Sequence, residues 1–317
     1  MIVPEVKTPE VHSTRWAVIL AGGSGKRLQP LTRRMFGEGR PKQFCNLFGD
    51  RTLLGDTQAR IGRVIPSERT MFVVVKAHAS YYTQELTGDA PRLLVQPVDR
   101  GTTAAIAYSL ARISAADSDG RNDDAIVGFF PADHHFADEA AFTSAVDRAY
   151  SLAHLYGEKI LLLGAQPQHP EVEYGWIEPG ATILDANGDS VFRVNRFWEK
   201  PSLEIARRLL DCGCLWNTFV MIGRVRTFLD ALRQSIPDVL HAFERMPPGS
   251  DCDGLYDNLA SGDFSKQVLS ALPDRLAVLR LDNVGWSDLG TPERVLAVAG
   301  GHAGNRFPLG STPLTAA

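Results

Sequence analysis

The chain alternates between short apolar runs and longer amphipathic stretches, and this alternation constrains its fold more than any other feature. Five runs are apolar at nearly every position: Trp16–Leu20, Met71–Val75, Leu93–Gln96, Ala125–Phe130 and Ile160–Gly164. Such runs are typical of strands buried on both faces. The stretches between them predict three helices, over Thr52–Val64, Thr102–Ala115 and Ala137–Leu155. The alternation therefore predicts a mostly parallel sheet with helices on both faces.

Helix-capping residues support two of these helices. Thr102 is expected to cap the second helix, because threonine side chains accept hydrogen bonds from the first turn. Asp138 and Glu139 fall in the first turn of the third helix, where carboxylates oppose the helix dipole. The sequence therefore predicts where these helices begin.

The pattern changes after Gly164. Two strand-like runs, Tyr174–Glu178 and Ser190–Trp198, follow each other without a full helix between them, joined through the turn-rich sequence DANGD. This arrangement indicates a mixed-sheet insertion. The remaining expected elements are helices over Leu203–Cys212, Thr227–Arg245 and Gly254–Leu269 and strands over Leu215–Ile222 and Leu276–Leu281.

Length and composition are those of an ordinary globular protein. The chain has 317 residues, of which 44% are hydrophobic and 22% charged, so it can bury a sizeable core without disulfides. No Pro/Ser-rich linker divides it. We therefore expect a flexible N-terminal arm over residues 1–14, one α/β domain over 15–299 and a flexible C-terminal tail over 300–317.

Charge, cysteines and hydropathy exclude several classes of protein. The 33 Lys and Arg residues against 37 Asp and Glu residues leave a net charge of −4, which argues against a nucleic-acid partner but permits a local basic pocket. Cys212-Gly-Cys214 has no second pair that would complete a zinc site, so reduced thiols are expected. The first 15 residues lack a secretory apolar region, and no apolar run approaches the length of a membrane span. These features predict a cytoplasmic protein without a membrane partner.

A glycine-rich cationic loop, LAGGSGKRLQPLTRRMFGEGRPKQF, begins at Leu20, directly after the first expected strand. Glycines let backbone N–H groups approach a ligand, and an array of such groups binds anions. Arg27 and Lys42 can then supply countercharge for phosphates. The loop lies at the carboxyl edge of the sheet, where ligands bind in open α/β folds. A tight strand-to-helix turn with solvated basic residues explains the glycines equally well.

Residue spacing separates this loop from two common phosphate-binding motifs. The P-loop requires Ser or Thr after Gly-Lys, but Arg27 follows Gly25-Lys26. The Rossmann fingerprint requires a third glycine where Leu28 stands. The first motif is therefore excluded, and a dinucleotide-dependent dehydrogenase is disfavoured.

Two aspartates that follow expected strands are the candidate metal ligands. Asp133 lies in FFPADHH and Asp288 in VGWSDLG. A carboxylate at the end of a buried strand is costly unless it is used, and Mg²⁺ prefers one or two carboxylates together with phosphate oxygens. The alternative is that each aspartate caps the helix that follows it. His134 and His135 lack zinc-ligand spacing, and we expect them to support the site rather than bind metal.

Together these segments resemble the sugar-phosphate nucleotidylyltransferases. The loop is similar to the family's N-terminal motif, and its ending, Pro41-Lys42-Gln43-Phe44, is most similar to that of mannose-1-phosphate guanylyltransferases. The further matching segments, in family order, are QPVDRGTTAAI, FFPADHH, PEVEYGWIEPG, FWEKP, LWNTFVMIG and VGWSDLG. The resemblance covers about residues 16–298. It implies a Rossmann-like, GT-A-like nucleotidyltransferase fold that uses Mg²⁺ to join a nucleoside triphosphate to a sugar 1-phosphate, releasing pyrophosphate.

The resemblance also implies a role for each matching residue. The implied nucleotide contacts are Leu20, Ala21, Gly22, Gly23, Ser24, Gly25, Arg27, Lys42, Gln96, Arg100, Gly101 and Thr102. The implied contacts to the sugar 1-phosphate are Glu171, Gly175, Glu199, Lys200 and Asn217. Asp133 and Asp288 are the implied metal ligands, and Arg27, Lys42 and Asp133 the implied catalytic residues.

The sequence departs from the family pattern at three places. Gln96 stands where guanylyltransferases often carry Glu, whose carboxylate accepts from both N1–H and N2–H₂ of guanine. An amide offers one acceptor and a donor, so the choice of base stays open at this point. Glu173 stands where the family often has Gly, and Thr218-Phe219 replaces the commoner Ser-Gly.

Three functions are compatible with these observations. The first is synthesis of GDP-mannose from GTP and mannose 1-phosphate, and the second is the same reaction with another pair, such as glucose 1-phosphate with UTP or dTTP. The third is a non-catalytic regulatory subunit that binds nucleotide sugars; such a protein is expected to have lost phosphate or metal ligands. The sequence leaves the oligomeric state open, including a homo-oligomer.

Overall fold

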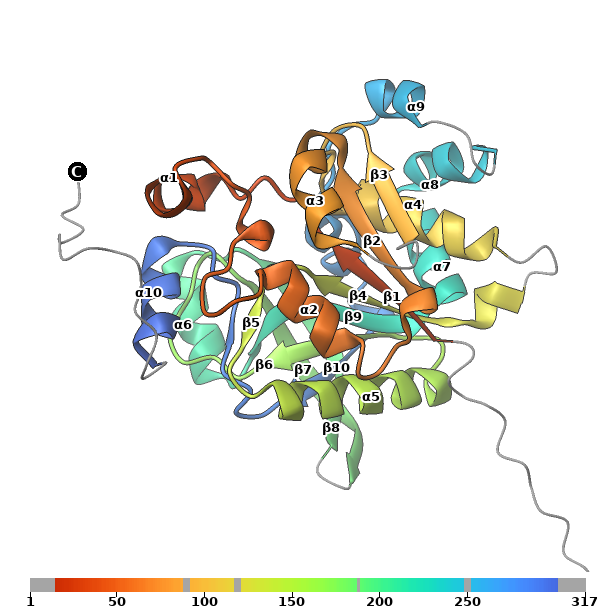
Figure 1. The fold of residues 1–317 in the computed structure, drawn as a ribbon. Coiled ribbons are helices and arrows are strands. Elements are labelled where there is room, and N and C mark those ends of the chain that lie inside the picture. The colour runs from red at the N-terminus through yellow and green to blue at the C-terminus, as the bar shows by residue number, and fades with distance from the viewer. Residues whose placement is uncertain (1–14, 88–91, 117–120, 187–188, 248–251, 302–317) are drawn as a thin grey trace, which may run out of the picture.

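A nine-stranded mixed sheet organises the computed structural model, which describes residues 15–87, 92–116, 121–186, 189–247 and 252–301 (Figure 1). The strand order is β3-β2-β1-β4-β9-β6-β10-β8-β7. The strands of this sheet are β1 (Arg15–Leu20), β2 (Thr70–Val75), β3 (Arg92–Gln96), β4 (Ile126–Pro131), β6 (Ile160–Ala165), β7 (Gly175–Ala186), β8 (Asp189–Glu199), β9 (Leu215–Arg224) and β10 (Leu276–Leu281). Two short strands, β5 (His135–Phe136) and β11 (Trp286–Ser287), pair separately.

The helices alternate with strands in the first half of the chain and cluster in the second. They are α1 (Gln29–Phe36), α2 (Leu53–Ile61), α3 (Ala79–Glu85), α4 (Gly101–Ser114), α5 (Glu139–Leu155), α6 (Leu203–Asp211), α7 (Val225–Ser235), α8 (Pro237–Glu244), α9 (Asp253–Asn258) and α10 (Pro292–Gly301). None of the described helices is long and apolar enough to cross a membrane. The expected arm, the tail beyond residue 301 and the centre of the DANGD turn lie outside the described residues.

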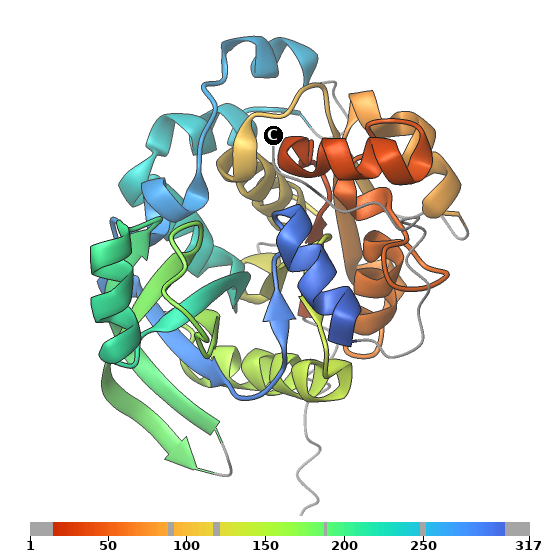
Figure 2. The ribbon, with the colours of Figure 1, turned by 90° about the vertical axis from the view of Figure 1, so that its left-hand side faces the viewer.

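Strand direction determines which chain segments meet at one edge of the sheet. β3, β2, β1 and β4 run parallel, as do β6 and β10. β9 lies antiparallel between β4 and β6, so its first residues lie beside the last residues of β6, with Trp216 opposite Ala165. The carboxyl ends of the parallel strands and the start of β9 therefore share one edge. Figure 2 looks toward the side of the molecule that carries α1, α6 and α10.

Successive side chains of a strand point to opposite faces of the sheet, and each face packs into its own hydrophobic core. On β1, Trp16 and Val18 join the cluster that contains residues of α4, α7 and α8. Ala17 joins the cluster on the other face, which contains residues of α5. Because both faces are covered, the strands are apolar at nearly every position. The expected fold class, a mostly parallel mixed sheet between helices, is confirmed.

One expected helix and one expected cap are wrong. The predicted helix Gly254–Leu269 is instead the short α9 and a separate π-helical turn, Ser265–Leu269. Between them the chain extends, because the Gly262 N–H and carbonyl bond to Arg100 and Thr103. Thr102 does not cap α4, since its hydroxyl accepts from the Phe264 N–H at 2.9 Å.

A second helix prediction needs a smaller correction. The expected helix Thr227–Arg245 is divided into α7 and α8 by Ile236, whose backbone is not helical (φ -147, ψ 60), before Pro237. Proline disfavours a helical conformation of the residue before it and has no N–H for a helical bond, so the first helix ends there and the second begins.

Candidate active site

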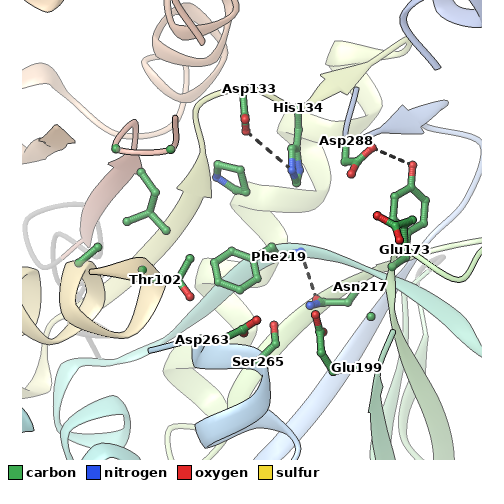
Figure 3. A pocket seen from close by; sticks show the side chains of 18 of the residues that line it. Thr102, Asp133, His134, Glu173, Glu199, Asn217, Phe219, Asp263, Ser265 and Asp288 are labelled. Carbon is green, nitrogen blue, oxygen red and sulfur yellow. Dashed lines mark hydrogen bonds and ion pairs between the residues drawn. The ribbon is translucent and has the colours of Figure 1, made fainter. Parts of the chain in front are cut away.

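A cavity of about 410 Å³ lies at the shared edge of the sheet (Figure 3). The expected nucleotide-contacting residues that line it are Leu20, Gly22, Gly23, Arg27, Gln96, Gly101 and Thr102. The expected sugar-phosphate and metal residues that line it are Gly175, Glu199, Lys200, Asn217, Asp133 and Asp288. The structure therefore brings together most of the residues that the sequence selected from separate segments.

Gln43 holds the glycine-rich loop in place. Its buried side-chain amide donates to the carbonyl oxygens of Ala21 and Gly23, each at 2.8 Å. At the other end of the loop, Gly25 has φ 57 and packs against the Lys42 backbone. The Gln43 side chain thus occupies two backbone carbonyls of the loop, those of Ala21 and Gly23. Three expected nucleotide contacts, Ala21, Ser24 and Gly25, are not among the lining residues.

Lys42 connects the two candidate metal ligands. Its Nζ lies 3.1 Å from Asp133 Oδ2 and also donates to the main-chain oxygen of Asp288. The Lys42 side chain is only 8% exposed, so its charge is poorly screened by water. The lysine lies behind the cavity wall and supplies positive charge between the two aspartates.

The Asp288 carboxylate is oriented by three donors that end on one oxygen. Oδ1 accepts from the Tyr174 hydroxyl at 3.1 Å, the Gly290 N–H at 2.8 Å and Arg294 Nη1 at 2.9 Å. Burial raises the pKa of this carboxyl, but His134 in its protonated form, Lys42 and Arg294 outweigh burial and lower the pKa overall. Of these three groups, Lys42 and Arg294 carry their charge at neutral pH. Asp288 is thereby held ionised.

His134 separates the two aspartates in Figure 3 and is a supporting residue. Burial lowers its pKa, so the imidazole is neutral at pH 7. The Trp286 indole N–H points at His134 Nδ1 at 3.2 Å, and Nε2 lies 3.9 Å from Asp133 Oδ1. This arrangement agrees with the expectation that the histidine supports the site. Within the described residues, no three His, Cys, Asp or Glu side chains gather as a metal-binding group.

Most of the expected contacts to the sugar 1-phosphate lie where β7, β8 and β9 meet. Gly175 pairs with Glu199, and a Cβ at Gly175 would lie 3.1 Å from Glu199 Oε2. Glu199 Oε1 accepts from Lys200 Nζ at 3.0 Å. Burial raises the pKa of Glu199. Burial acts to lower the pKa of Lys200, but the hydrogen bond that Lys200 donates to Glu199, together with the Glu199 charge, raises the pKa of Lys200 overall. The lysine therefore stays protonated at neutral pH.

The departure at Thr218-Phe219 has a structural consequence. Phe219 lines the cavity with φ 59, in the left-handed region that favours glycine. Asn217 Oδ1 accepts from the Phe219 N–H at 3.1 Å, and the Thr218 hydroxyl donates to the Leu163 carbonyl at 2.7 Å. These bonds hold a strained conformation that places an aromatic ring inside the cavity.

Besides Ala21, Ser24, Gly25 and Lys42, two further expected residues, Glu171 and Arg100, do not line the cavity. Glu171 Oε2 lies 2.7 Å from Arg294 Nη2, so this carboxylate is paired with an arginine outside the cavity lining. Arg100 donates through Nε to the Tyr256 carbonyl at 3.0 Å and faces α9. Both residues support other residues of the site rather than line it.

Several lining or supporting residues were not selected from the sequence. One is Glu173, which lines the cavity and contacts Arg27. Other residues that sequence analysis did not select include Tyr174, Phe219, Asp263, Ser265, Trp286 and Arg294. Tyr174, Phe219 and Trp286 lie within quoted motifs, so a search extended to every residue of those motifs would have found them. Asp263, Ser265 and Arg294 carry no local signal.

Comparison with known proteins decides the family. A family model described as nucleotidyl transferase matches residues 16–302. The chain belongs to the nucleotidyl transferase family. Among its similar relatives is the mannose-1-phosphate guanylyltransferase of Escherichia coli (strain K12), 32% identical over 295 residues that cover 88% of this chain and 59% of the relative. A second, from Sinorhizobium fredii (strain NBRC 101917 / NGR234), is 33% identical over 292 residues that cover 87% of this chain and 53% of the relative.

The chain spans less than three fifths of the length of those curated relatives, at 59% and 53%. A solved structure from Thermus thermophilus, titled as a mannose-1-phosphate geranyltransferase, is 29% identical with a TM-score of 0.76 and covers 90% of this chain and 79% of its own. A UDP-glucose pyrophosphorylase complexed with UDP-glucose, 15% identical, has a TM-score of 0.56 and covers 90% and 97%. The expected Rossmann-like, GT-A-like nucleotidyltransferase fold is confirmed.

Proposed function

We propose that this nucleotidyl transferase transfers GMP from GTP to mannose 1-phosphate, forming GDP-mannose and releasing pyrophosphate. The observation that carries the proposal is the arrangement of the cavity. Loop residues Gly22 and Gly23 line it together with Gln96, and Lys200 and Asn217, two of the expected contacts to the sugar 1-phosphate, line it as well. The names of the similar relatives support the choice of substrates. A cytoplasmic location stays a prediction.

Asp133 and Asp288 fit a magnesium ion. Mg²⁺ prefers one or two carboxylates and completes its shell with water and phosphate oxygens. The three hydrogen bonds to Asp288 all end on Oδ1, and within the described ranges none ends on Oδ2. Oδ2 is therefore available to a cation. When bound, magnesium supplies positive charge that reduces repulsion between the two substrates' phosphates.

The remaining chemistry is positioning and charge neutralisation. An oxygen of the sugar phosphate forms a bond to the α-phosphorus of GTP, while the bond between that phosphorus and the β-phosphate's bridging oxygen breaks. The attacking oxygen is already anionic, so no general base is required. Lys200 holds the sugar phosphate and Arg27 stabilises departing pyrophosphate, while Lys42 supplies positive charge for the triphosphate from behind the cavity wall.

A second pair of substrates is favoured by one residue. Gln96 presents an amide where a carboxylate would accept two donors from guanine. An amide also suits uracil or thymine, so UTP or dTTP with glucose 1-phosphate is the alternative pair. Arg27, Lys42, Asp133, Lys200 and Asp288 are all present, which disfavours a non-catalytic regulatory subunit.

A substrate matrix tests the proposal. The full-length protein is incubated with Mg²⁺ and each of GTP, UTP, dTTP and ATP, crossed with mannose 1-phosphate and glucose 1-phosphate, and pyrophosphate release is measured. The highest kcat/KM is expected for GTP with mannose 1-phosphate. A higher kcat/KM for UTP or dTTP with glucose 1-phosphate would identify that pair, instead of GTP and mannose 1-phosphate, as the substrates. No release with any pair would contradict an enzymatic function.

A further inference from the structure

Gln96 is the buried polar group at the nucleotide end of the cavity. It ends β3, is only 2% exposed and lines the cavity beside the glycine-rich loop. Its Nε2 atom lies 3.1 Å from the position that a Cβ would take on Gly22. The nitrogen end of the amide is thus directed toward the loop that the proposed function assigns to the nucleotide.

Tyr256 binds the other end of the same amide. Its hydroxyl donates to Gln96 Oε1 at 3.0 Å, from a side chain that is 0% exposed and does not line the cavity. Burial raises the pKa of the Tyr256 hydroxyl, so it remains a donor throughout the physiological range. The phenol ring packs edge-on against Phe243, with 5.9 Å between ring centroids. The donor is therefore fixed in both position and protonation.

Backbone contacts hold Tyr256 against the segment that follows Gln96. Arg100 Nε donates to the Tyr256 carbonyl at 3.0 Å, and the Gly262 N–H donates to the Arg100 carbonyl at 2.9 Å. Gly101 has φ 81, and a Cβ there would collide with the Gly262 carbonyl. The close approach of these two chain segments thus requires glycine at position 101. Tyr256 and Gln96 belong to one rigid assembly although 160 residues separate them.

We propose that Tyr256 is a positioning residue that selects the base. Its hydroxyl occupies the acceptor of the Gln96 amide, so that Nε2 presents an N–H donor to the nucleotide. This inference rests on the proposed function, because it assumes that the cavity binds a nucleoside triphosphate. It deepens that function by naming the class of base.

A fixed donor favours bases with a carbonyl oxygen at their hydrogen-bonding edge. Guanine O6 and uracil O4 accept from an N–H group, whereas adenine and cytosine present amino groups at the same positions. Two donors facing each other in a buried site leave both unsatisfied, which weakens binding. The protein is therefore expected to prefer GTP over ATP and UTP over CTP.

Tyr256→Phe tests the inference because it removes only the hydroxyl and frees the amide to rotate. Equilibrium dialysis measures the Kd of the full-length protein for GTP, ATP, UTP and CTP with Mg²⁺ and without sugar phosphate, so that no turnover occurs. The GTP/ATP and UTP/CTP preferences should each fall about fivefold to tenfold, the factor expected for one net hydrogen bond. Gln96→Met should lower both preferences similarly, and the double variant should show no further loss.

Tyr150→Phe is the matched control. Tyr150 is also fully buried, and its hydroxyl donates to the Trp16 carbonyl at 2.7 Å in the core on the other face of the sheet. It should change stability without changing either preference. Equal weakening of all four nucleotides by Tyr256→Phe, or no change, would overturn the inference.

The inference and the proposed function fail separately. Wild-type protein that binds none of the four triphosphates would overturn both at the first measurement. Wild-type protein that shows the two preferences, loses them in Tyr256→Phe and yet transfers no nucleotide to a sugar phosphate would support the inference and overturn the proposed reaction.

Discussion

Lys42 Nζ lies 3.1 Å from Asp133 Oδ2 and donates to the backbone oxygen of Asp288 as well. The lysine therefore joins the segment after β4 to the segment after β11. Its positive charge lies beside a carboxylate proposed to hold magnesium, where triphosphate charge would also accumulate. The ion pair keeps the two carboxylate segments together before substrates bind.

Asp133→Asn should abolish most turnover while the fold survives. Asparagine keeps an oxygen that can accept from Lys42 but loses the charge proposed to bind magnesium. We expect turnover to fall by at least about 100-fold, the scale of losing one electrostatic contributor to catalysis. Pyrophosphate release measures turnover, and thermal unfolding monitors the fold. Asp211→Asn, at an exposed position ending α6, is the control and should retain activity; near-normal turnover in Asp133→Asn would contradict the assignment.

Arg294→Met should destabilise the protein at neutral pH. Arg294 Nη2 lies 2.7 Å from Glu171 and Nη1 lies 2.9 Å from Asp288, and all three side chains are less than 20% exposed. Methionine retains apolar packing over Tyr174 but leaves two carboxylates without this cation. Removing one member of a buried ion pair costs about 3 kcal/mol of unfolding free energy. Urea denaturation at pH 7 measures the loss without adding salt.

The difference in unfolding free energy between Arg294→Met and wild type should disappear at acid pH. The fold lowers the pKa of Asp288 and Glu171 from their ordinary 3.8 and 4.5, against the raising effect of burial. Their stabilisation is present above those ordinary values and is lost as pH falls through the lowered ones. Arg233→Met, which removes half-exposed ion pairs on α7, should cost less than about 1 kcal/mol. A difference between Arg294→Met and wild type that stays constant down to acid pH would contradict this account.

Much of the site is predictable because parallel topology gathers strand ends. Asp133 and the glycine loop follow the apolar runs that become β4 and β1, so their convergence follows from the strand pattern alone. Lys200 and Asn217 required the family resemblance, since the antiparallel placement of β9 has no clear sequence signature. The sequence pattern thus predicted the edge of the sheet, and the resemblance supplied the residues proposed to contact the sugar phosphate.

The supporting contacts were not predictable because they join segments that are distant in sequence. Arg294 lies on α10 and looks like an ordinary exposed helix residue until Asp288 and Glu171 are placed beside it. The predicted helix Gly254–Leu269 failed for the same reason. Its periodicity is helical, but Gly262 makes its backbone bonds to the start of α4 instead. Tertiary contacts there override local propensity.

The strained conformation of Phe219 predicts an inverted order of stability between two variants. Phe219→Gly and Phe219→Ala both remove the aromatic ring, so their difference reports backbone strain at φ 59. Phe219→Gly should be more stable than Phe219→Ala by about 1 kcal/mol, because a Cβ is unfavourable in the left-handed region. Urea unfolding compares them. Val220, next on β9 and without a positive φ, is the control: there the alanine variant should be the more stable. An alanine variant more stable than the glycine variant at both positions would mean that Phe219 is unstrained.

The contact between Arg27 and Glu173, which both line the cavity, predicts opposite effects of two substitutions on pyrophosphate binding. Both side chains are about half exposed, at 54% and 43%, so the pair is weak and Glu173 competes with phosphate for the arginine. Glu173→Gln should lower the inhibition constant of pyrophosphate about twofold to fivefold, the factor equivalent to one exposed ion pair. Arg27→Ala should raise that constant. Because the competing charges are solvated, the effect of Glu173→Gln on the inhibition constant should shrink as ionic strength rises.

Glu204→Gln is the control. It breaks an exposed ion pair with Arg208 on α6 and should leave the inhibition constant of pyrophosphate unchanged. An inhibition constant that is the same in Glu173→Gln and wild type at low salt would show that Glu173 does not restrain Arg27.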